Sequence, residues 1–423
     1  MQNRVVITGM GVVSPNGVGL PAFENAIING ISGIKFDQQL ADLGFSCQIS
    51  GKPILSEDLI SNYLTPLQLK NFNSSGILYG IIAGIDAWRD AGLPINETES
   101  PLWDYGTVFG AGSSGIACFR EAIYKIDDLQ VKRLGSTTVV QIMNSGISAY
   151  LSGKLGLGNQ VSTNSSACCT GTESLLIAYD RIKAGNAEIM LAGSTTDSGP
   201  YIWGGFDAMK VCTYKHNDSP EQGSRPMSES ASGFVPGSGA GAFVVESLAH
   251  AIARGAKIYA EILGGNLNSG GQRGKGTMTA PNSIAVQNCI TKALANANIT
   301  HKEIDAINGH LTATSMDATE IKNWTEALQR SGKDFPYINS LKSMVGHCLS
   351  AAGSIECVAA VLQIKNNFLF PNLNIEDLHP EIKNLIDEEK IPRKTISKEI
   401  NILVKASFGF GDVNACIVFK KYK

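Results

Sequence analysis

The sequence predicts an α/β fold made of two copies of one unit, and three observations support this prediction. Short apolar runs typical of buried strands alternate with longer segments of helical periodicity, which favours parallel-rich sheets covered by helices. The strand-like run at 257–263, which ends in glycines, repeats the pattern of 4–11. A turn of small residues that opens a helix also occurs twice, at 165–182 and at 346–362.

The length and composition agree with such a duplication. The chain has 423 residues, of which 43% are hydrophobic and 17% are charged, as in globular proteins with a large core. We therefore expect an N-terminal half at 1–255, which contains the first small-residue turn, and a C-terminal half at 256–423, which contains the second.

Charge, cysteine usage and apolar run length argue against several classes of protein. The formal net charge of -3 provides no electrostatic footprint for nucleic acid. Nine cysteines without a CxxC pair do not support a zinc or thioredoxin-like site, and an odd number without a secretory signal predicts a reducing compartment. No apolar run reaches the roughly 18–20 residues that span a bilayer. We expect a soluble cytoplasmic protein with no nucleic-acid partner, no membrane and no bound metal.

The periodicity places the expected elements in order along the chain. Strands are expected at 4–11, 106–110, 188–192, 242–246, 257–263, 304–307, 337–340 and 415–419, and helices at 22–30, 76–92, 140–155, 175–182, 247–254 and 355–362. Glycines close a helix at Gly156 and a strand at Gly193. Segments 35–75 and 209–233 are polar and irregular. Segment 116–135 is amphipathic, and we interpret its charged side as a solvated face.

The centre of the candidate site is the stretch 164–171. Small residues surround Cys168 and Cys169, and a helical run follows. A cysteine at a helix N-terminus lies near the positive end of the aligned peptide dipoles, which favours the thiolate and therefore nucleophilic catalysis. The alternative is that both cysteines are small core residues, because free cysteine is among the most buried residue types.

Two of the six histidines lie in unusual turns. His310 and His347 each follow a strand-like run and stand among glycine, serine and threonine. A lone histidine is commonly structural or merely exposed. Two of them beside a thiol suit acyl transfer through a thioester, and two neutral imidazoles can donate hydrogen bonds to one enolate oxygen. Lys342 lies five residues before His347 and could pair with an acid, for which Asp317 and Glu320 are the candidates.

A series of motifs runs from the first strand to the last. In order, they are Arg4-Val5-Val6-Ile7-Thr8-Gly9-Met10-Gly11-Val12-Val13-Ser14-Pro15, Ser166-Ala167-Cys168, Arg225-Pro226, Gly233-Phe234-Val235, Gly239-Ala240-Gly241, His310 with Thr312 and Thr314, Lys342-Ser343-Met344 with Gly346-His347, and Ser407-Phe408-Gly409-Phe410-Gly411. Together they resemble the β-ketoacyl-acyl carrier protein synthases, in the synthase I/II branch of the thiolase superfamily. Several motifs in one order are far more specific than any single motif.

The resemblance implies a five-layered αβαβα thiolase-like fold, duplicated as inferred above and usually a homodimer. The nucleophile of the family falls on Cys168, and Cys169 takes the place of a small residue. His310 and His347 match the two histidines that assist decarboxylation and condensation. Lys342 matches the family lysine near them.

Further roles follow from the same resemblance. Glu320 matches the acidic partner of that lysine, and Asp317 supports the same region. Thr312 and Thr314 match the threonines that hold the phosphopantetheine arm, and Phe408 belongs to the same substrate-binding region. The oxyanion donors would be the backbone N–H groups of Cys168 and Phe410, and Phe410 also matches the phenylalanine that gates the cysteine.

The implied reaction is a decarboxylative Claisen condensation. An acyl group moves from its carrier thiol to Cys168, and malonyl-acyl carrier protein loses CO2 to give an enolate held by His310 and His347. The enolate attacks the thioester and extends the chain by two carbons. The resemblance implies no metal or redox cofactor, and the phosphopantetheine belongs to the acyl carrier protein, which is the expected partner. Lys70, Lys132 and Arg133 are candidates for docking it.

Three departures from the family pattern bear on specificity. Leu311 stands where glycine usually follows the first histidine, and Asp412 replaces a flexible glycine beyond the gating phenylalanine, which puts the usual gate motion in doubt. Ser113 aligns with a position that narrows the acyl pocket and is often isoleucine. A smaller polar residue there would admit a longer, stiffer or more polar chain. This suggests a specialised synthase for polyene or aryl-polyene pigment chains rather than a housekeeping fatty acid enzyme.

Four alternative functions are compatible with parts of the same sequence pattern. The chain could be the catalytic half of a heterodimer with a chain-length factor. A non-catalytic chain-length factor is disfavoured because such subunits usually lose the cysteine. A degradative thiolase would need a second catalytic cysteine near the C-terminus, but Cys416 lies in an apolar run and is expected in a core strand. A synthase III-type enzyme would carry asparagine at the position of His347.

Overall fold

The computed structural model describes residues 3–70 and 72–423. Ten strands form the main path of the central sheet: β1 (Val5–Ser14), β5 (Tyr105–Ala111), β6 (Val161–Ser162), β7 (Ile189–Thr196), β8 (Gly239–Ser247), β9 (Ala260–Ser269), β10 (Ala306–Asn308), β11 (Tyr337–Asn339), β14 (Ile402–Gly409) and β15 (Val413–Lys421). The shorter strands are β2 (Gly17–Val18), β3 (Ile34–Phe36), β4 (Ile49–Gly51), β12 (Phe368–Leu369) and β13 (Ile396–Ser397).

The sheet repeats one topology twice. Its N-terminal part has the order β6-β5-β7-β8-β1, and its C-terminal part has the order β11-β10-β14-β15-β9. In each part the second strand of the order is parallel to both neighbours, and the remaining pairs are antiparallel. The parts join where Val5–Ile7 pairs with Ala260–Ile262. The predicted duplication is therefore present, but the expectation of parallel-rich sheets was wrong, because β8 and β15 return antiparallel to their neighbours.

The helices have the following bounds: α1 (Leu20–Ile28), α2 (Gln38–Asp42), α3 (Glu57–Ser61), α4 (Pro66–Leu69), α5 (Ser75–Asp90), α6 (Ile116–Asp127), α7 (Thr138–Ile142), α8 (Gly146–Leu155), α9 (Thr170–Lys183), α10 (Pro200–Ala208), α11 (Leu248–Ala253), α12 (Ser283–Asn296), α13 (Asp317–Leu328), α14 (Lys342–Val345), α15 (Ala352–Asn366) and α16 (Pro380–Leu385). The one helix expected at 140–155 is two helices, α7 and α8. None of the helices in the described ranges is long and apolar enough to cross a membrane.

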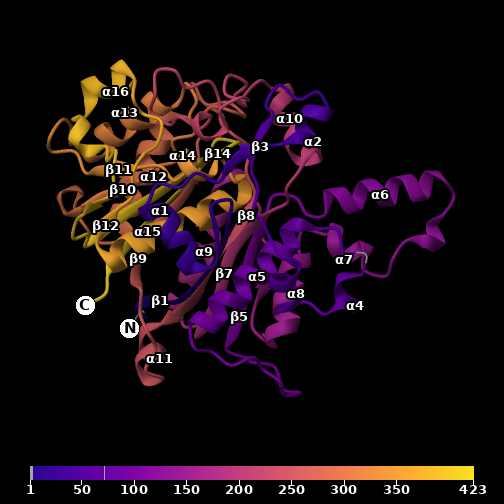
Figure 1. The fold of residues 1–423 in the computed structure, drawn as a ribbon. Coiled ribbons are helices and arrows are strands. Elements are labelled where there is room, and N and C mark those ends of the chain that lie inside the picture. Colours follow the sequence, from indigo (N-terminus) through magenta and orange to yellow (C-terminus); the bar gives the residue numbers. More distant parts are fainter. Residues whose placement is uncertain (1–2, 71) are drawn as a thin grey trace.

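Five layers follow from the helix packing (Figure 1). The helices α9 and α15 contact each other and lie between the two parts of the sheet. On the outer face of the N-terminal part, α5 packs on β1, β7 and β8, and α8 packs on β5. On the C-terminal side, α12 packs on β9 and β15, and α13 packs on α12. This is the thiolase-like αβαβα arrangement.

Two matching turns start the central helices. The 3-10 turn η2 (Ala167–Cys169) precedes α9, and the 3-10 turn η5 (Leu349–Ala351) precedes α15. The residues Ala167 and Leu349 occupy equivalent positions, and both have a φ of 49°, in the left-handed region that costs free energy for a residue with a Cβ atom. The helices cross closely at glycines, since a Cβ on Gly171 would lie 2.2 Å from the Ser354 amide nitrogen. The small residues therefore serve both the turn and the helix crossing.

Candidate active site

Cys168 and Cys169 have different surroundings, although they are adjacent. The side chain of Cys168 lines two cavities, whereas Cys169 is buried and only 1% exposed. The Cys169 thiol donates hydrogen bonds to the carbonyl oxygens of Ser407 at 3.1 Å and Val413 at 3.2 Å. The structure thus directs Cys168 toward the two cavities, whereas Cys169 packs η2 against the hairpin of β14 and β15.

The resting Cys168 thiol is protonated. Burial raises its pKa to about 11, against the opposing effects of Lys342 and of hydrogen bonds from the N–H groups of Phe410 and Cys168 itself. The helix N-terminus favours the thiolate, as expected, but desolvation outweighs this effect and the other favourable contacts. The thiol proton must leave as the acyl group arrives. The same two N–H groups are those that the resemblance assigned to the oxyanion hole.

His310 and His347 stand beside this thiol. The Cys168 sulfur and one nitrogen of each imidazole lie within 4.8 Å of one another. The imidazole centroids are 5.4 Å apart and the rings are nearly perpendicular, at 83°. Aromatic rings pack on the outer sides, with Phe408 next to His310 at 6.0 Å and Phe234 next to His347 at 5.2 Å. Both imidazoles can therefore reach one atom placed between them and the sulfur.

Both imidazoles are neutral, and each holds its proton on Nε2. Burial and then Lys342 hold the pKa of both histidines well below the ordinary value of 6.5. The Nδ1 atom of His347 accepts a hydrogen bond from the Leu349 amide at 3.1 Å, and the Nδ1 atom of His310 lies 3.5 Å from the Lys342 ammonium. Because a neutral imidazole has one donor and one acceptor nitrogen, both Nε2–H groups are free to donate to a substrate oxygen.

Two buried carboxyl groups shape the loop that carries His310. Glu320 accepts hydrogen bonds from the backbone N–H groups of His310 and Leu311, both at 2.7 Å. Asp317 accepts from the N–H groups of Thr312 at 2.9 Å and Ala313 at 3.1 Å. Burial raises the pKa of Asp317 to about 6 and that of Glu320 to about 7. Both acids therefore support the loop, and both also border the cavity that His310 and His347 line.

This loop also explains one departure from the family pattern. Leu311 has a φ of 24°, and the next residue but one, Ala313, has a φ of 62°. Glycine adopts such angles at no steric cost, so a glycine after the first histidine suits this turn. Leu311 tolerates the strain because its side chain is fully buried in the core beneath α12 and α13.

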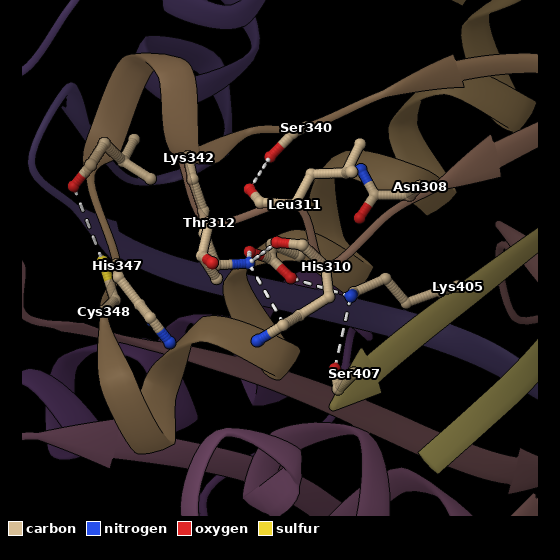
Figure 2. A network of polar contacts seen from close by, with 12 residues as sticks. Asn308, His310, Leu311, Thr312, Ser340, Lys342, His347, Cys348, Lys405 and Ser407 are labelled. Atoms are coloured by element: carbon tan, nitrogen blue, oxygen red, sulfur yellow. Dashed lines mark hydrogen bonds and ion pairs between the residues drawn. The ribbon is translucent and has the colours of Figure 1, made fainter. Parts of the chain in front are cut away.

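The acidic partner of Lys342 is not the expected one. The expectation was that Lys342 pairs with Glu320 or Asp317, but its ammonium forms an ion pair with Glu356 of α15 and donates to the carbonyl oxygen of His310 at 2.6 Å. Glu320 has its oxygens occupied by backbone amides of the His310 loop. Figure 2 shows Lys342 reaching His310 from α14. The lysine thus fixes the backbone and the ring of His310 at once.

Two cavities meet at Cys168. One, of about 320 Å³, is lined by both histidines and by Thr312, Thr314 and Phe408. The other, also about 320 Å³, is lined by Ser113 and lies toward α6 and α10. A larger cavity of about 680 Å³ contains none of these residues. The structure therefore brings the predicted arm-binding threonines to one side of the nucleophile and Ser113 to the other.

Phe410 lies at the junction, since it lines both cavities. Its ring contacts Phe206 at a centroid distance of 6.0 Å. Beyond it, Asp412 has a φ of 60° and is buried, and its carboxylate accepts from the N–H groups of Gln272 at 3.0 Å and Asn282 at 2.8 Å. The aspartate that replaces a family glycine therefore ties the segment after Phe410 to the segment 270–282, which borders the same cavity.

Cys168, His310 and His347 also have the spacing of metal ligands. A thiol and two imidazoles at this spacing are suitable donors for zinc or copper. Lys342, however, lies within 3.5 Å of His310, and a second buried lysine, Lys405, lies close by with its Nζ 3.2 Å from the Ser407 hydroxyl (Figure 2). The positive charges of the two lysines oppose the binding of a metal cation by these three groups.

Cys416 and the predicted docking residues lie outside the group of reacting side chains. Cys416 is fully buried in β15, as expected for a core residue, and all nine cysteines are free. Lys70, Lys132 and Arg133 are exposed and line neither cavity at Cys168, so their docking role stays a prediction. Sequence reasoning missed Glu356 and Lys405. Each is a lone charged residue inside an apolar run, which is a signal that could have identified them.

The chemistry available where the cavities meet is acyl transfer through a cysteine thioester, and the fold around it is that of the thiolase superfamily. Comparison with known families narrows this class. A family model described as "Beta-ketoacyl synthase, N-terminal domain" matches residues 2–251, and one described as "Beta-ketoacyl synthase, C-terminal domain" matches residues 259–376. The chain belongs to the β-ketoacyl synthase family.

Individual relatives agree with this assignment. The chain is 32% identical to 3-oxoacyl-[acyl-carrier-protein] synthase 2 of Vibrio harveyi over 99% of both proteins. Among solved structures, it is similar to one chain of a complex between a type II polyketide synthase acyl-carrier protein and its ketosynthase. The TM-score is 0.88, the identity is 28%, and both chains are fully covered. It is also similar to the ishigamide ketosynthase/chain length factor, with a TM-score of 0.87, 25% identity and full coverage of both chains.

Proposed function

We propose that this protein is a β-ketoacyl-acyl carrier protein synthase that extends an acyl chain by two carbons. The observation that carries the proposal is the approach of Cys168, His310 and His347 to within 4.8 Å at the junction of two cavities. One cavity suits an arm that enters past the threonines, and the other suits an acyl chain. The relatives named 3-oxoacyl-[acyl-carrier-protein] synthase support the same reaction.

The reaction begins with acyl transfer. The Cys168 sulfur attacks the thioester carbon, the bond to the carrier sulfur breaks, and the thiol proton passes to the departing carrier thiolate. The N–H groups of Cys168 and Phe410, which contact the sulfur in the resting site, hold the oxyanion as it forms. Because the pKa of the thiol is about 11, deprotonation accompanies the attack rather than preceding it.

Condensation follows at the two histidines. Malonyl-acyl carrier protein places its thioester oxygen between the Nε2–H groups of His310 and His347. The C–C bond to the carboxylate breaks, CO2 leaves, and its bonding electrons form the enolate that both imidazoles stabilise. The enolate carbon then attacks the Cys168 thioester, and the sulfur leaves as a thiolate that regains a proton. Every group that acts on the substrate belongs to this chain, and the phosphopantetheine arrives on the carrier.

The test is intact-protein mass spectrometry after incubation with acyl-carrier thioesters, followed by malonyl-acyl carrier protein. The panel contains saturated, polyunsaturated and aryl-substituted acyl groups. We expect an acyl adduct on Cys168 that disappears, with release of a product two carbons longer, when the malonyl donor is added. An adduct that forms but never turns over would contradict the proposal of an elongating enzyme, and loading confined to saturated chains would contradict the polyene or aryl-polyene specialisation.

Ser113 is proposed to set chain selectivity. It lines the cavity that leads from Cys168 toward α6 and α10, where isoleucine would occupy more of the volume of about 320 Å³. Replacing Ser113 with isoleucine is expected to lower kcat/KM for long or conjugated acyl chains by about tenfold or more, as for a blocked apolar pocket. Transfer of an acetyl group, which does not reach that residue, serves as the internal control. An unchanged chain-length profile would show that Ser113 does not limit the pocket.

A second copy of this chain is the partner that the exposed apolar surface supports. Helix α6 projects from the body of the molecule beyond α7 and α8 (Figure 1), and the sheet ends with β6 in the same N-terminal part. Large apolar side chains on and after α6 are exposed by 41–92%: Phe119, Ile123, Tyr124, Ile126, Leu129, Val131 and Val139. The segment 116–135, whose charged side was interpreted as a solvated face, therefore also exposes apolar side chains. Exposed apolar patches and an open strand edge are typical of a subunit interface.

The oligomer is tested by light scattering on the purified protein. We expect a mass of about twice 44.9 kDa, and we expect Phe119→Glu with Ile123→Glu to give the monomer. Ile252→Glu on α11, also exposed, is the matched control and should remain a dimer. A monomer at all concentrations would instead favour the alternative that the partner is a chain-length-factor-like subunit, as in one of the similar structures.

A further inference from the structure

Two buried lysines share one buried carboxylate behind the catalytic histidines. Lys342 of α14 is 1% exposed, Lys405 of β14 is 0% exposed, and Glu356 of α15 is 2% exposed. The Lys405 nitrogen lies 2.8 Å from one carboxylate oxygen, and the Lys342 nitrogen forms an ion pair with the other. Figure 2 shows the two lysine side chains converging from different elements, with His310 beside them. We call these three residues the lysine cluster.

Both lysines are surrounded as ammonium groups. Lys405 has three oxygen neighbours, which are the Glu356 carboxylate, the Ser407 hydroxyl at 3.2 Å and the Ala406 carbonyl oxygen. Lys342 likewise has three acceptors, since it contacts Glu356 and both the carbonyl oxygen and Nδ1 of His310. An ammonium group has three donors and no acceptor, and both surroundings match it.

The lysine cluster therefore has one positive charge in excess. Lys342 and Glu356 alone would neutralise each other, and Lys405 adds the second cation. Burying an uncompensated charge costs free energy, so Lys405 is difficult to explain as a means of stabilising the fold. Its position offers a different explanation, because the charge faces the place where the proposed reaction develops an enolate.

Other charged and titratable groups also lie around the two histidines. Cys168 on η2 is a neutral thiol at rest, and Asp317 and Glu320 on α13 are turned to backbone amides of the His310 loop. The pKa of both histidines is lowered by burial first, by Lys342 next and also by Lys405. With Lys342 and Glu356 alone the charge beside the histidines would be neutral, and Lys405 makes it positive.

We propose that Lys405 is a positioning residue for condensation, which acts through Glu356 to leave one positive charge beside His310 and His347. This charge keeps both imidazoles neutral and stabilises the enolate that they hold. The proposal rests on the proposed function and adds a residue to it. Lys405 does not touch the substrate, because it lies behind His310 and contacts Ser407, whose neighbour Phe408 lines the cavity.

The first test replaces Lys405 with methionine, which has a similar length and no charge. We expect the rate of decarboxylation of malonyl-acyl carrier protein to fall by about tenfold or more, because the positive charge that stabilises the enolate is lost. Acylation of Cys168 should fall by less than about threefold, because its oxyanion is held by backbone amides. Lys420→Met, an exposed lysine on β15, is the matched control and should change neither rate.

The second measurement is histidine titration by NMR, which a purely structural role would not move. The chain has six histidines, and single His→Gln variants assign the signals. Because a nearby cation disfavours imidazolium, loss of Lys405 should raise the pKa of His310 and His347 toward the ordinary value of 6.5. The acid limb of the decarboxylation profile should move to higher pH with it, while signals from the other histidines stay in place.

A rescue variant separates charge from packing. Lys405→Met combined with Glu356→Gln leaves Lys342 as a single cation and so restores the excess charge. We expect this double variant to recover the wild-type histidine pKa values and most of the lost decarboxylation. If the double variant is as slow as Lys405→Met and the histidine titrations are unchanged in both, Lys405 has only a structural role and the proposal is wrong.

The same variants remain informative if Lys405→Met does not fold or if the wild-type protein is inactive. If Lys405→Met does not fold, the double variant is compared with Glu356→Gln alone, in which both cations remain. The histidine pKa should then be lower in the single variant, and equal values would overturn the proposal. If the wild-type protein neither loads an acyl group nor decarboxylates the malonyl donor, the proposed function fails, whereas the titration still decides whether Lys405 sets the charge.

Discussion

Replacing Cys168 with alanine is expected to abolish acyl-enzyme formation and chain extension, whereas Cys169→Ala is expected to retain both. Cys168 lines both cavities, and its sulfur lies within 4.8 Å of both imidazoles, while Cys169 is 1% exposed and its thiol is bonded to backbone carbonyls. Loss of a covalent nucleophile lowers the rate by several powers of ten, on the order of 10⁴ to 10⁶. Mass spectrometry of the loaded protein and release of the extended product are the measurements.

The two cysteine variants control for each other. Both remove one thiol from the same turn, so a general disturbance of η2 would reduce loading in both. The Cys169 variant should lose some stability, of about 1 kcal/mol, because a buried thiol that fills the contact with β14 and β15 is removed. Loading of Cys168→Ala with no loading of Cys169→Ala would move the nucleophile to Cys169.

Replacing His310 or His347 with alanine is expected to lower decarboxylation of malonyl-acyl carrier protein by about 10² to 10³, as for the loss of one donor to a developing oxyanion. Both Nε2–H groups are available because each Nδ1 atom is held by an amide or an ammonium group. Loading of Cys168 should be less affected, because the N–H groups of Cys168 and Phe410 hold that oxyanion. The rates of CO2 release and of acyl loading are compared for each variant.

His301→Ala is the control for this pair, since His301 lies on the 3-10 turn η4 (His301–Glu303) and lines neither cavity at Cys168. It should leave both rates unchanged. Equal losses of loading and decarboxylation in the His310 and His347 variants would contradict a role of the imidazoles that is confined to the enolate.

The sequence was sufficient to predict the duplication because each half repeats the order of its apolar runs. The strands β1 and β9, expected at 4–11 and 257–263, begin the two matching parts of the sheet. Strand direction was not predictable from the same runs. A buried antiparallel strand such as β8 is as apolar as a parallel one, so hydrophobicity does not encode which way it runs.

The candidate site was predicted only where glycine, serine and threonine mark a turn around a reactive residue. Cys168, His310 and His347 have such turns, and the structure brings them together from η2 and from the loops after β10 and α14. The acidic partner of Lys342 could not be inferred from the sequence. Glu320 and Glu356 each lie on a helix that follows one of the two histidines, and only the packing shows which of them contacts the lysine. The pKa of Cys168 also depends on burial, which the sequence does not specify.

The matching turns η2 and η5 have an evolutionary consequence. After duplication, two elbows with the same backbone were available, and each has been committed to a different task. The first presents Cys168, and in the second the Leu349 amide fixes the proton of His347 on Nε2 while Ser350 is bonded to Thr195 and Thr196. Because the nucleophile comes from one half and both histidines come from the other, neither half contains a complete site by itself.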